Sequence, residues 1–223
     1  MREPEIGFLC NNASSDCMMD EHYAFFLQKF GQAMERREVP ASSIAKYKHR
    51  LPDQLLDYWA DHGWSGYAEG LFWTVNPQDY ESILSNWTPN TELDPTEEYH
   101  VIARGAFGVL YVWGKKGGHC LNISSYAGRY HAFANQFTGE KLELGAKVFF
   151  SSLNPIYNDL SDLFKPALEK LGPLKSDEMY GFVPALALGG PMKLKNLQKV
   201  KTIEHLTFLS QLAPLQDWGF PDV

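Results

Sequence analysis

The stretch that decides the fold, residues 99–123, reads YHVIARGAFGVLYVWGKKGGHCLNI and contains three short apolar segments. These segments, 101–103, 109–113 and 120–123, are rich in β-branched and aromatic residues, as strands are. Glycines that permit tight turns separate them, and these are Gly105, Gly108, Gly114, Gly117 and Gly118. The pattern therefore predicts a meander of strands at the centre of the chain.

Helical patterns lie on both sides of this meander. Before it, a helix is expected to begin after Asp20, which can cap it, and a second helix is expected over residues 51–62. After it, residues 154–171, which Pro166 is expected to kink or split, and residues 202–212 carry apolar side chains at helical spacing. We therefore expect an α+β fold, with a central, mostly antiparallel sheet on which helices from both ends of the chain pack.

The remaining segments give weaker signals. A strand is expected at 70–75, followed by a short helix over 76–87 that begins with an Asn-Pro pair. Further strands are expected at 129–134 and 146–151. Residues 64–67 are flanked by glycine and are expected to form a loop.

The chain is long enough for one large domain or two modest ones, and its 44% hydrophobic content suffices for a buried core. Residues 1–19 show no periodicity and are expected to form a leader. We expect a first domain over 20–148 and a second over 149–223, packed closely on the first.

Acidic residues are concentrated in one segment of the chain. Between Leu51 and His100 there are ten Asp or Glu residues and no Lys or Arg, whereas the formal net charge of the whole chain is −7. The remainder of the chain is therefore slightly basic. Such a segment must find positive charge elsewhere in the fold or on a partner.

Three of these acids form a row. Asp53, Asp57 and Asp61 are four residues apart, so a helix over 51–62 places them on one face, where each like-charge pair costs about 0.2–0.5 kcal/mol. Two interpretations stay open. The row binds a basic partner, or nearby basic side chains of the same chain fold back and neutralise it; the candidates are Arg36, Arg37, Lys46, Lys48 and Arg50.

Other patterns exclude several classes of function. The acidic balance argues against direct nucleic-acid binding, and no apolar run approaches the roughly 20 residues that span a bilayer. Three cysteines form no disulfide framework, and the N-terminal sequence lacks the pattern of a signal peptide, so we expect a cytoplasmic protein. The scattered histidines and the absence of nucleophile and phosphate-binding motifs predict no catalytic, cofactor or metal site.

Several motifs resemble the GAD-like domain family. They are LPDQLLDYW (51–59), GWSGY (63–67), GLFWTVNP (70–77) and ARGAFG (103–108). The later stretch DEMYGFVPALALGG (177–190), with residues 200–206, resembles the C-terminal domain that follows it. This two-part arrangement is similar to that of immunity proteins of bacterial type VI secretion DNase toxins. The resemblance implies a cytoplasmic, non-catalytic protein that binds a cognate nuclease.

The acidic segment fits this implication, because a nuclease cleft must attract a polyanion and an acidic face can occupy it. We expect the partner to be a nuclease toxin with a basic cleft. The candidate partner-binding residues are Asp53, Asp57, Asp61, Trp64, Tyr67, Glu97, Glu98, Asp177 and Glu178. Two alternatives are a non-catalytic adaptor or regulator that binds another basic protein, and a metal-dependent hydrolase that uses the adjacent acidic pairs.

Overall fold

The computed structural model describes residues 20–218, so the expected leader lies outside the described residues. The helices are α1 (Glu21–Phe30), α2 (Ala41–Tyr47), α3 (Asp53–His62), α4 (Glu81–Trp87), α5 (Leu142–Ser152), α6 (Phe164–Leu171) and α7 (Thr202–Leu212). The strands are β1 (Met34–Arg37), β2 (Trp64–Tyr67), β3 (Phe72–Thr74), β4 (Tyr99–Gly105), β5 (Val109–Gly114), β6 (Gly118–Ser124), β7 (Arg129–Ala132), β8 (Glu178–Phe182), β9 (Leu197–Lys201) and β10 (Gln216–Asp217).

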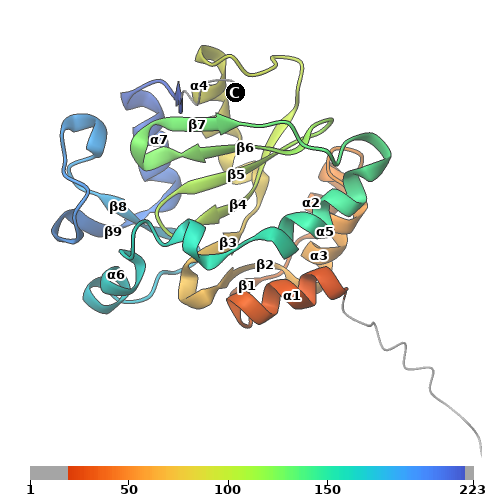
Figure 1. Cartoon of the computed structure of the whole chain (residues 1–223), viewed down its shortest axis with the longest axis horizontal. Coiled ribbons are helices and arrows are strands. Elements are labelled where there is room, and N and C mark those ends of the chain that lie inside the picture. The colour runs from red at the N-terminus through yellow and green to blue at the C-terminus, as the bar shows by residue number, and fades with distance from the viewer. Residues whose placement is uncertain (1–19, 219–223) are drawn as a thin grey trace, which may run out of the picture.

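The main sheet has the strand order β1-β2-β3-β4-β5-β6-β7-β10 (Figure 1). All its neighbours are antiparallel except β7 and β10, which are parallel. The predicted central meander is therefore confirmed, and so is the α+β class. Strands β8 and β9 form a separate antiparallel hairpin at one side of the molecule.

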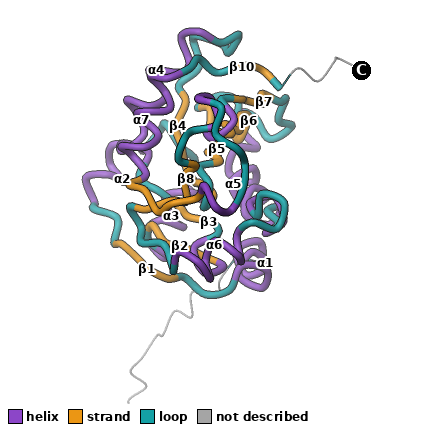
Figure 2. Tube along the Cα trace, turned by 90° about the vertical axis from the view of Figure 1, so that its left-hand side faces the viewer, coloured by secondary structure: helices purple, strands orange, loops and turns teal. Residues whose placement is uncertain are grey.

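Helices cover both faces of the sheet, with α4 and α7 on one side and α1 and α5 on the other (Figure 2). Successive residues of a strand point to opposite faces, so a strand covered on both sides is apolar at nearly every position. In β5, Leu110 and Val112 join the core under α4 and α7, whereas Tyr111 and Trp113 join the core under α1, α3 and α5. This explains the unbroken apolar run at 109–113.

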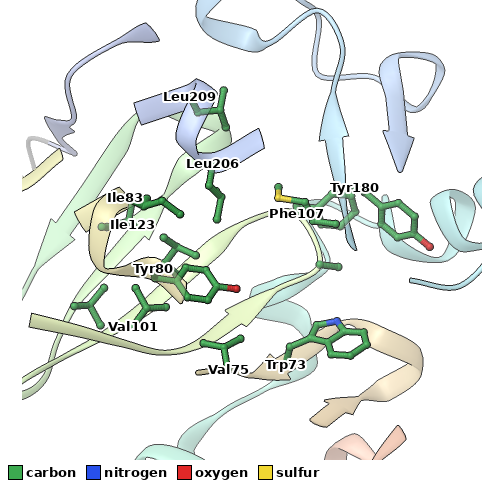
Figure 3. Close-up of a cluster of buried hydrophobic side chains, with 14 of the residues drawn as sticks. Trp73, Val75, Tyr80, Ile83, Val101, Phe107, Ile123, Tyr180, Leu206 and Leu209 are labelled. Carbon is green, nitrogen blue, oxygen red and sulfur yellow. The ribbon is translucent and has the colours of Figure 1, made fainter. Parts of the chain in front are cut away.

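The core under α4 and α7 joins residues from the middle of the chain to residues near its C-terminal end. Figure 3 shows Leu206 and Leu209 of α7 directed toward the side chains of Ile83 and Ile123, while Tyr180 of β8 lies beside Phe107. The predicted domain boundary at 148/149 falls inside α5, and one continuous core joins the segments on either side.

One buried cation ties the hairpin to the sheet. Arg104 of β4 is 0% exposed, and its Nη2 donates to the backbone oxygens of Ser176 at 3.0 Å and Glu178 at 2.9 Å. Its guanidinium also lies 5.0 Å from the ring of Trp73. The tyrosine at the centre of β8, Tyr180, donates its backbone N–H to the carbonyl of Ala106, just beyond Arg104.

Several element predictions are wrong. Residues 146–151 belong to helix α5, because Ala146, Phe149, Phe150 and Leu153 recur at helical spacing and all face one core. Residues 64–67 form the buried strand β2, which pairs with β1 and β3. The helical zone expected over 154–171 is split, but the break comes before Phe164 and not at Pro166: a short 3-10 turn is followed by α6, which contains Pro166.

Candidate functional site

Helix α3 presents the acidic row because its apolar residues fix its orientation. Leu55, Leu56 and Trp59 face the core that α3 shares with α1 and α5. The helix ends at Gly63, whose φ of 69° favours glycine. Asp53, Asp57 and Asp61 consequently lie on the opposite face, and all three are exposed.

A fourth carboxylate joins this row from α5. The Oε1 and Oε2 atoms of Glu143 accept hydrogen bonds from the backbone N–H groups of Asp53 at 3.1 Å and Gln54 at 2.8 Å. An anion is favourable at this N-terminus of α3 because the first N–H groups of a helix lack partners. We call Asp53, Asp57, Asp61 and Glu143 the acidic face.

The four carboxylates act on one another. Partial burial raises the pKa of Asp57, and the charges of Asp53, Asp61 and Glu143 raise it further. The acidic face thus holds uncompensated repulsion. Sequence reasoning missed Glu143, because it lies 90 residues from Asp53 and only the packing of α5 beside α3 brings them together.

The basic residues that could neutralise the row bind elsewhere. Lys46 pairs with Glu81 at 2.7 Å, and Arg50 pairs with Glu98 at 2.9 Å. Arg36 donates to the backbone oxygen of Asp61 at 3.4 Å, and its Nη1 lies 3.9 Å from the carboxylate of Glu38. Within residues 20–218, none of the ion pairs includes a carboxylate of the acidic face. The structure therefore does not bear out internal neutralisation of the row.

The candidates Glu97 and Glu98 are already occupied. Glu97 accepts from the backbone N–H groups of Lys116 and Gly117, which holds the 88–98 loop against the β5–β6 turn. Besides Arg50, Glu98 lies 3.8 Å from the Nζ of Lys115. Both carboxylates therefore have partners within the fold, and their part in binding a partner stays a prediction.

The acidic pair of the C-terminal half is occupied as well. Asp177 binds Lys201 at 2.6 Å, across the β8–β9 hairpin, and Lys201 holds the pKa of this carboxyl below its usual range. Glu178 accepts from the backbone N–H of Lys175 at 3.0 Å and lies 4.0 Å from Lys199. This pair stabilises the hairpin, and its part in partner binding stays a prediction.

The two aromatic candidates are core residues. Trp64 is 5% exposed and Tyr67 is 0% exposed, because β2 is covered on both faces. The Tyr67 hydroxyl lies 2.7 Å from that of Tyr23 on α1, which satisfies both buried groups. Both side chains are therefore packed in the core and present no exposed surface in this fold.

The described part of the chain gathers no group of three His, Cys, Asp or Glu side chains in a geometry that could hold a metal ion. Over the same residues, every helix is too short or too polar to cross a membrane. The acidic face is an open row of carboxylates, and such a row is suited to contact with a complementary charged surface.

We expect that replacing Asp57 with Asn raises the free energy of unfolding at pH 7 by about 0.4–1 kcal/mol, because two like-charge pairs are removed. Urea denaturation followed by tryptophan fluorescence measures this change. The pKa of Asp57 is raised in the folded state. The ionised Asp57 side chain therefore destabilises the folded protein at pH values above that pKa. The advantage of the variant should disappear below about pH 4, where both states are protonated. Glu204→Gln, at an exposed acid of α7, is the matched control. A loss of stability in Asp57→Asn would show that the row is compensated.

Comparisons with known proteins agree with this two-part chain. Residues 21–127 match the family model of the GAD-like domain, and residues 145–213 match that of T6SS immunity protein Tdi1, C-terminal. The crystal structure of Atu4351 from Agrobacterium tumefaciens is similar in fold, with a TM-score of 0.77 and 22% sequence identity, over 89% of this chain and 94% of that chain. A search of curated proteins found no match.

Proposed function

Because this chain joins a GAD-like domain to a C-terminal domain of the Tdi1 immunity family, we propose that it neutralises a type VI secretion DNase toxin. The protein acts in the cytoplasm, without catalysis, by binding the cognate nuclease and blocking its nucleic-acid-binding or catalytic cleft. The Tdi1 family match supports an immunity protein of this secretion system. The observation that supports the mode of binding is the acidic face, whose carboxylates form no ion pair with a cation among residues 20–218.

The physical basis is charge mimicry. A cleft that binds a phosphate backbone is lined by Lys and Arg. The three aspartates of α3 are spaced by about 6 Å along the helix, because each residue rises about 1.5 Å. A rigid row of this kind attracts the cleft over a distance and fixes its orientation. A cationic surface that covers the acidic face relieves the repulsion among its carboxylates. This relief adds to the free energy of binding.

The metal-dependent hydrolase alternative was based on the two adjacent acidic pairs, Glu97-Glu98 and Asp177-Glu178. Both adjacent acidic pairs are tied to lysine, arginine or backbone N–H groups of this chain. The adaptor alternative differs from the proposed function only in the identity of the basic partner, so a partner search separates the two.

We expect co-expression with the products of the neighbouring open reading frames to yield a stable complex with one of them. Each product is tagged in turn, and the pull-down is followed by size-exclusion chromatography. The co-purified partner should degrade DNA when alone, and stoichiometric amounts of this chain should abolish that activity. A partner without nuclease activity would favour the adaptor, and the absence of any complex would overturn the proposal.

A further inference from the structure

We propose that Asp20 is a positioning residue for the acidic face, because it holds the ammonium group of Lys147 away from the four carboxylates. The acidic face then stays available to a cationic partner. This inference rests on the proposed function and adds to it a residue that preserves the charge of the contact surface. Sequence reasoning identified Asp20 only as the cap of a helix.

Lys147 stands at a position from which it could neutralise the acidic face. It follows Glu143 by four positions on α5, so the two side chains lie on the same side of that helix. A glutamate four residues before a lysine is also the favourable order for an ion pair on a helix. Glu143 binds the start of α3, and its charge acts on Asp57. An ion pair between Lys147 and Glu143 would therefore reduce the negative charge of the whole face.

In the folded chain, Lys147 binds Asp20 instead. Its Nζ donates to the Oδ2 of Asp20 at 2.7 Å, and both side chains are partly buried, so salt screens this pair less than an exposed one. Burial by itself would raise the pKa of Asp20, but hydrogen bonds from Lys147 and Tyr58 bring this pKa below its ordinary value. The Asp20 carboxylate is thus ionised at neutral pH and keeps Lys147 paired.

The other carboxylate oxygen of Asp20 fixes the position of this group. Its Oδ1 accepts from the hydroxyl of Tyr58 at 2.8 Å and from the backbone N–H groups of His22 at 3.1 Å and Tyr23 at 3.4 Å. These bonds join the start of α1 to α3, and the bond from Lys147 adds α5. The two oxygens of Asp20 therefore have separate tasks, since Oδ1 caps α1 and Oδ2 holds the lysine.

This division of tasks allows a selective variant. Asp20→Asn keeps an oxygen in the place of Oδ1, and asparagine caps a helix about as well as aspartate does. Its NH₂ group takes the place of Oδ2, and because that group only donates, it cannot accept a bond from Lys147. Asp20→Ser also retains a capping oxygen without a carboxylate, so it is the second variant should Asp20→Asn fail to fold.

The restraint on Lys147 is tested first without the toxin. NMR titration of the side-chain ¹³C signals of the full chain gives the pKa of Asp57, which rises when a nearby cation is removed. We expect Lys147→Met to raise this pKa at least about twice as much in the Asp20→Asn background as in the wild-type background, because the released ammonium lies closer to the acidic face. Position 20 is the same within each comparison, so the change reports on Lys147 alone. Equal rises in the two backgrounds would overturn the inference.

The consequence for binding is tested with the nuclease that co-purifies with this chain. Asp20→Asn should weaken its binding by at least about threefold, because a released ammonium meets a cationic cleft, and adding Lys147→Met should restore the affinity to within about twofold. Glu204→Gln removes one exposed acid elsewhere and is the control for net charge. An Asp20→Asn variant that binds as tightly as this control would overturn the inference alone. Failure of the unmodified chain to bind any nuclease would instead overturn the proposed function.

Discussion

Reversing the three aspartates of α3 to lysine is expected to weaken binding of the nuclease by at least about 100-fold at roughly 0.1 M salt. A cationic cleft that meets three lysines loses its attraction and gains repulsion, and juxtaposed like charges cost several kcal/mol. The side chains are exposed and make no ion pair within the described chain, so folding should persist. Isothermal titration calorimetry gives the affinity, and stopped-flow mixing shows whether the association rate falls first.

The control reverses three other exposed acids, Glu92, Glu169 and Glu204. Both triple variants change the formal net charge from −7 to −1, so they differ only in where the charge lies. We expect the control to lose less than about fivefold in affinity through long-range attraction. Equal losses in the two variants would show that net charge alone matters and would dismiss α3 as the contact. For the wild-type chain, affinity should fall steeply with added salt, and the α3 variant should lose that dependence.

The second large effect concerns stability. Replacing Arg104 with Met should lower the free energy of unfolding by about 2–4 kcal/mol, because the part-buried backbone oxygens of Ser176 and Glu178 lose their donor. Met retains much of the side-chain volume, so the loss reports mainly on the hydrogen bonds. The substitution also removes the free-energy cost of burying a charged guanidinium. The expected loss of stability is therefore smaller than the loss of the hydrogen bonds alone would give.

Urea denaturation and hydrogen exchange measure this effect together. The amide of Tyr180, which pairs with Ala106, should exchange much faster in Arg104→Met, whereas amides of β5 and β6 should change less. Arg104→Lys should recover only part of the stability, since an ammonium lacks the planar fork of a guanidinium. Lys48→Met, at an exposed site, is the control for charge removal. A change below about 0.5 kcal/mol in Arg104→Met would show that the hairpin does not depend on this cation.

Local sequence patterns predicted much of the fold correctly. The meander from β4 to β7 followed from short apolar runs separated by glycine, and α1, α3 and α7 followed from helical spacing and their caps. The failures share a cause. At residues 64–67 the flanking glycines indicated a loop, and at 146–151 a short apolar run allowed either a strand or a helix. In both cases only the neighbouring elements in the fold decide.

The sequence was enough to place the three aspartates of α3 on one face, but it was not enough to place the other candidate residues. The four-residue spacing of the α3 aspartates is enough to predict that they share one face, and the folded chain confirms that placement. The surroundings of the other six candidates come from distant parts of the chain, so the sequence did not show which of them are buried or already paired. Lys201 neutralises Asp177, and Arg50 neutralises Glu98. Trp64 is covered by the packing of β2 within the sheet.

The sequence by itself determined that this protein has a strand-rich centre, helices on either side and an unbalanced block of negative charge, because periodicity and charge are properties of neighbours along the chain. Tertiary structure decided which of those charges remain free. Ion pairs form between residues 24 or 48 positions apart, and Glu143 reaches the start of α3 from 90 positions away. Coulomb forces and hydrogen bonds depend on separation in space, so only the folded chain distinguishes a charge available to a partner from one already neutralised.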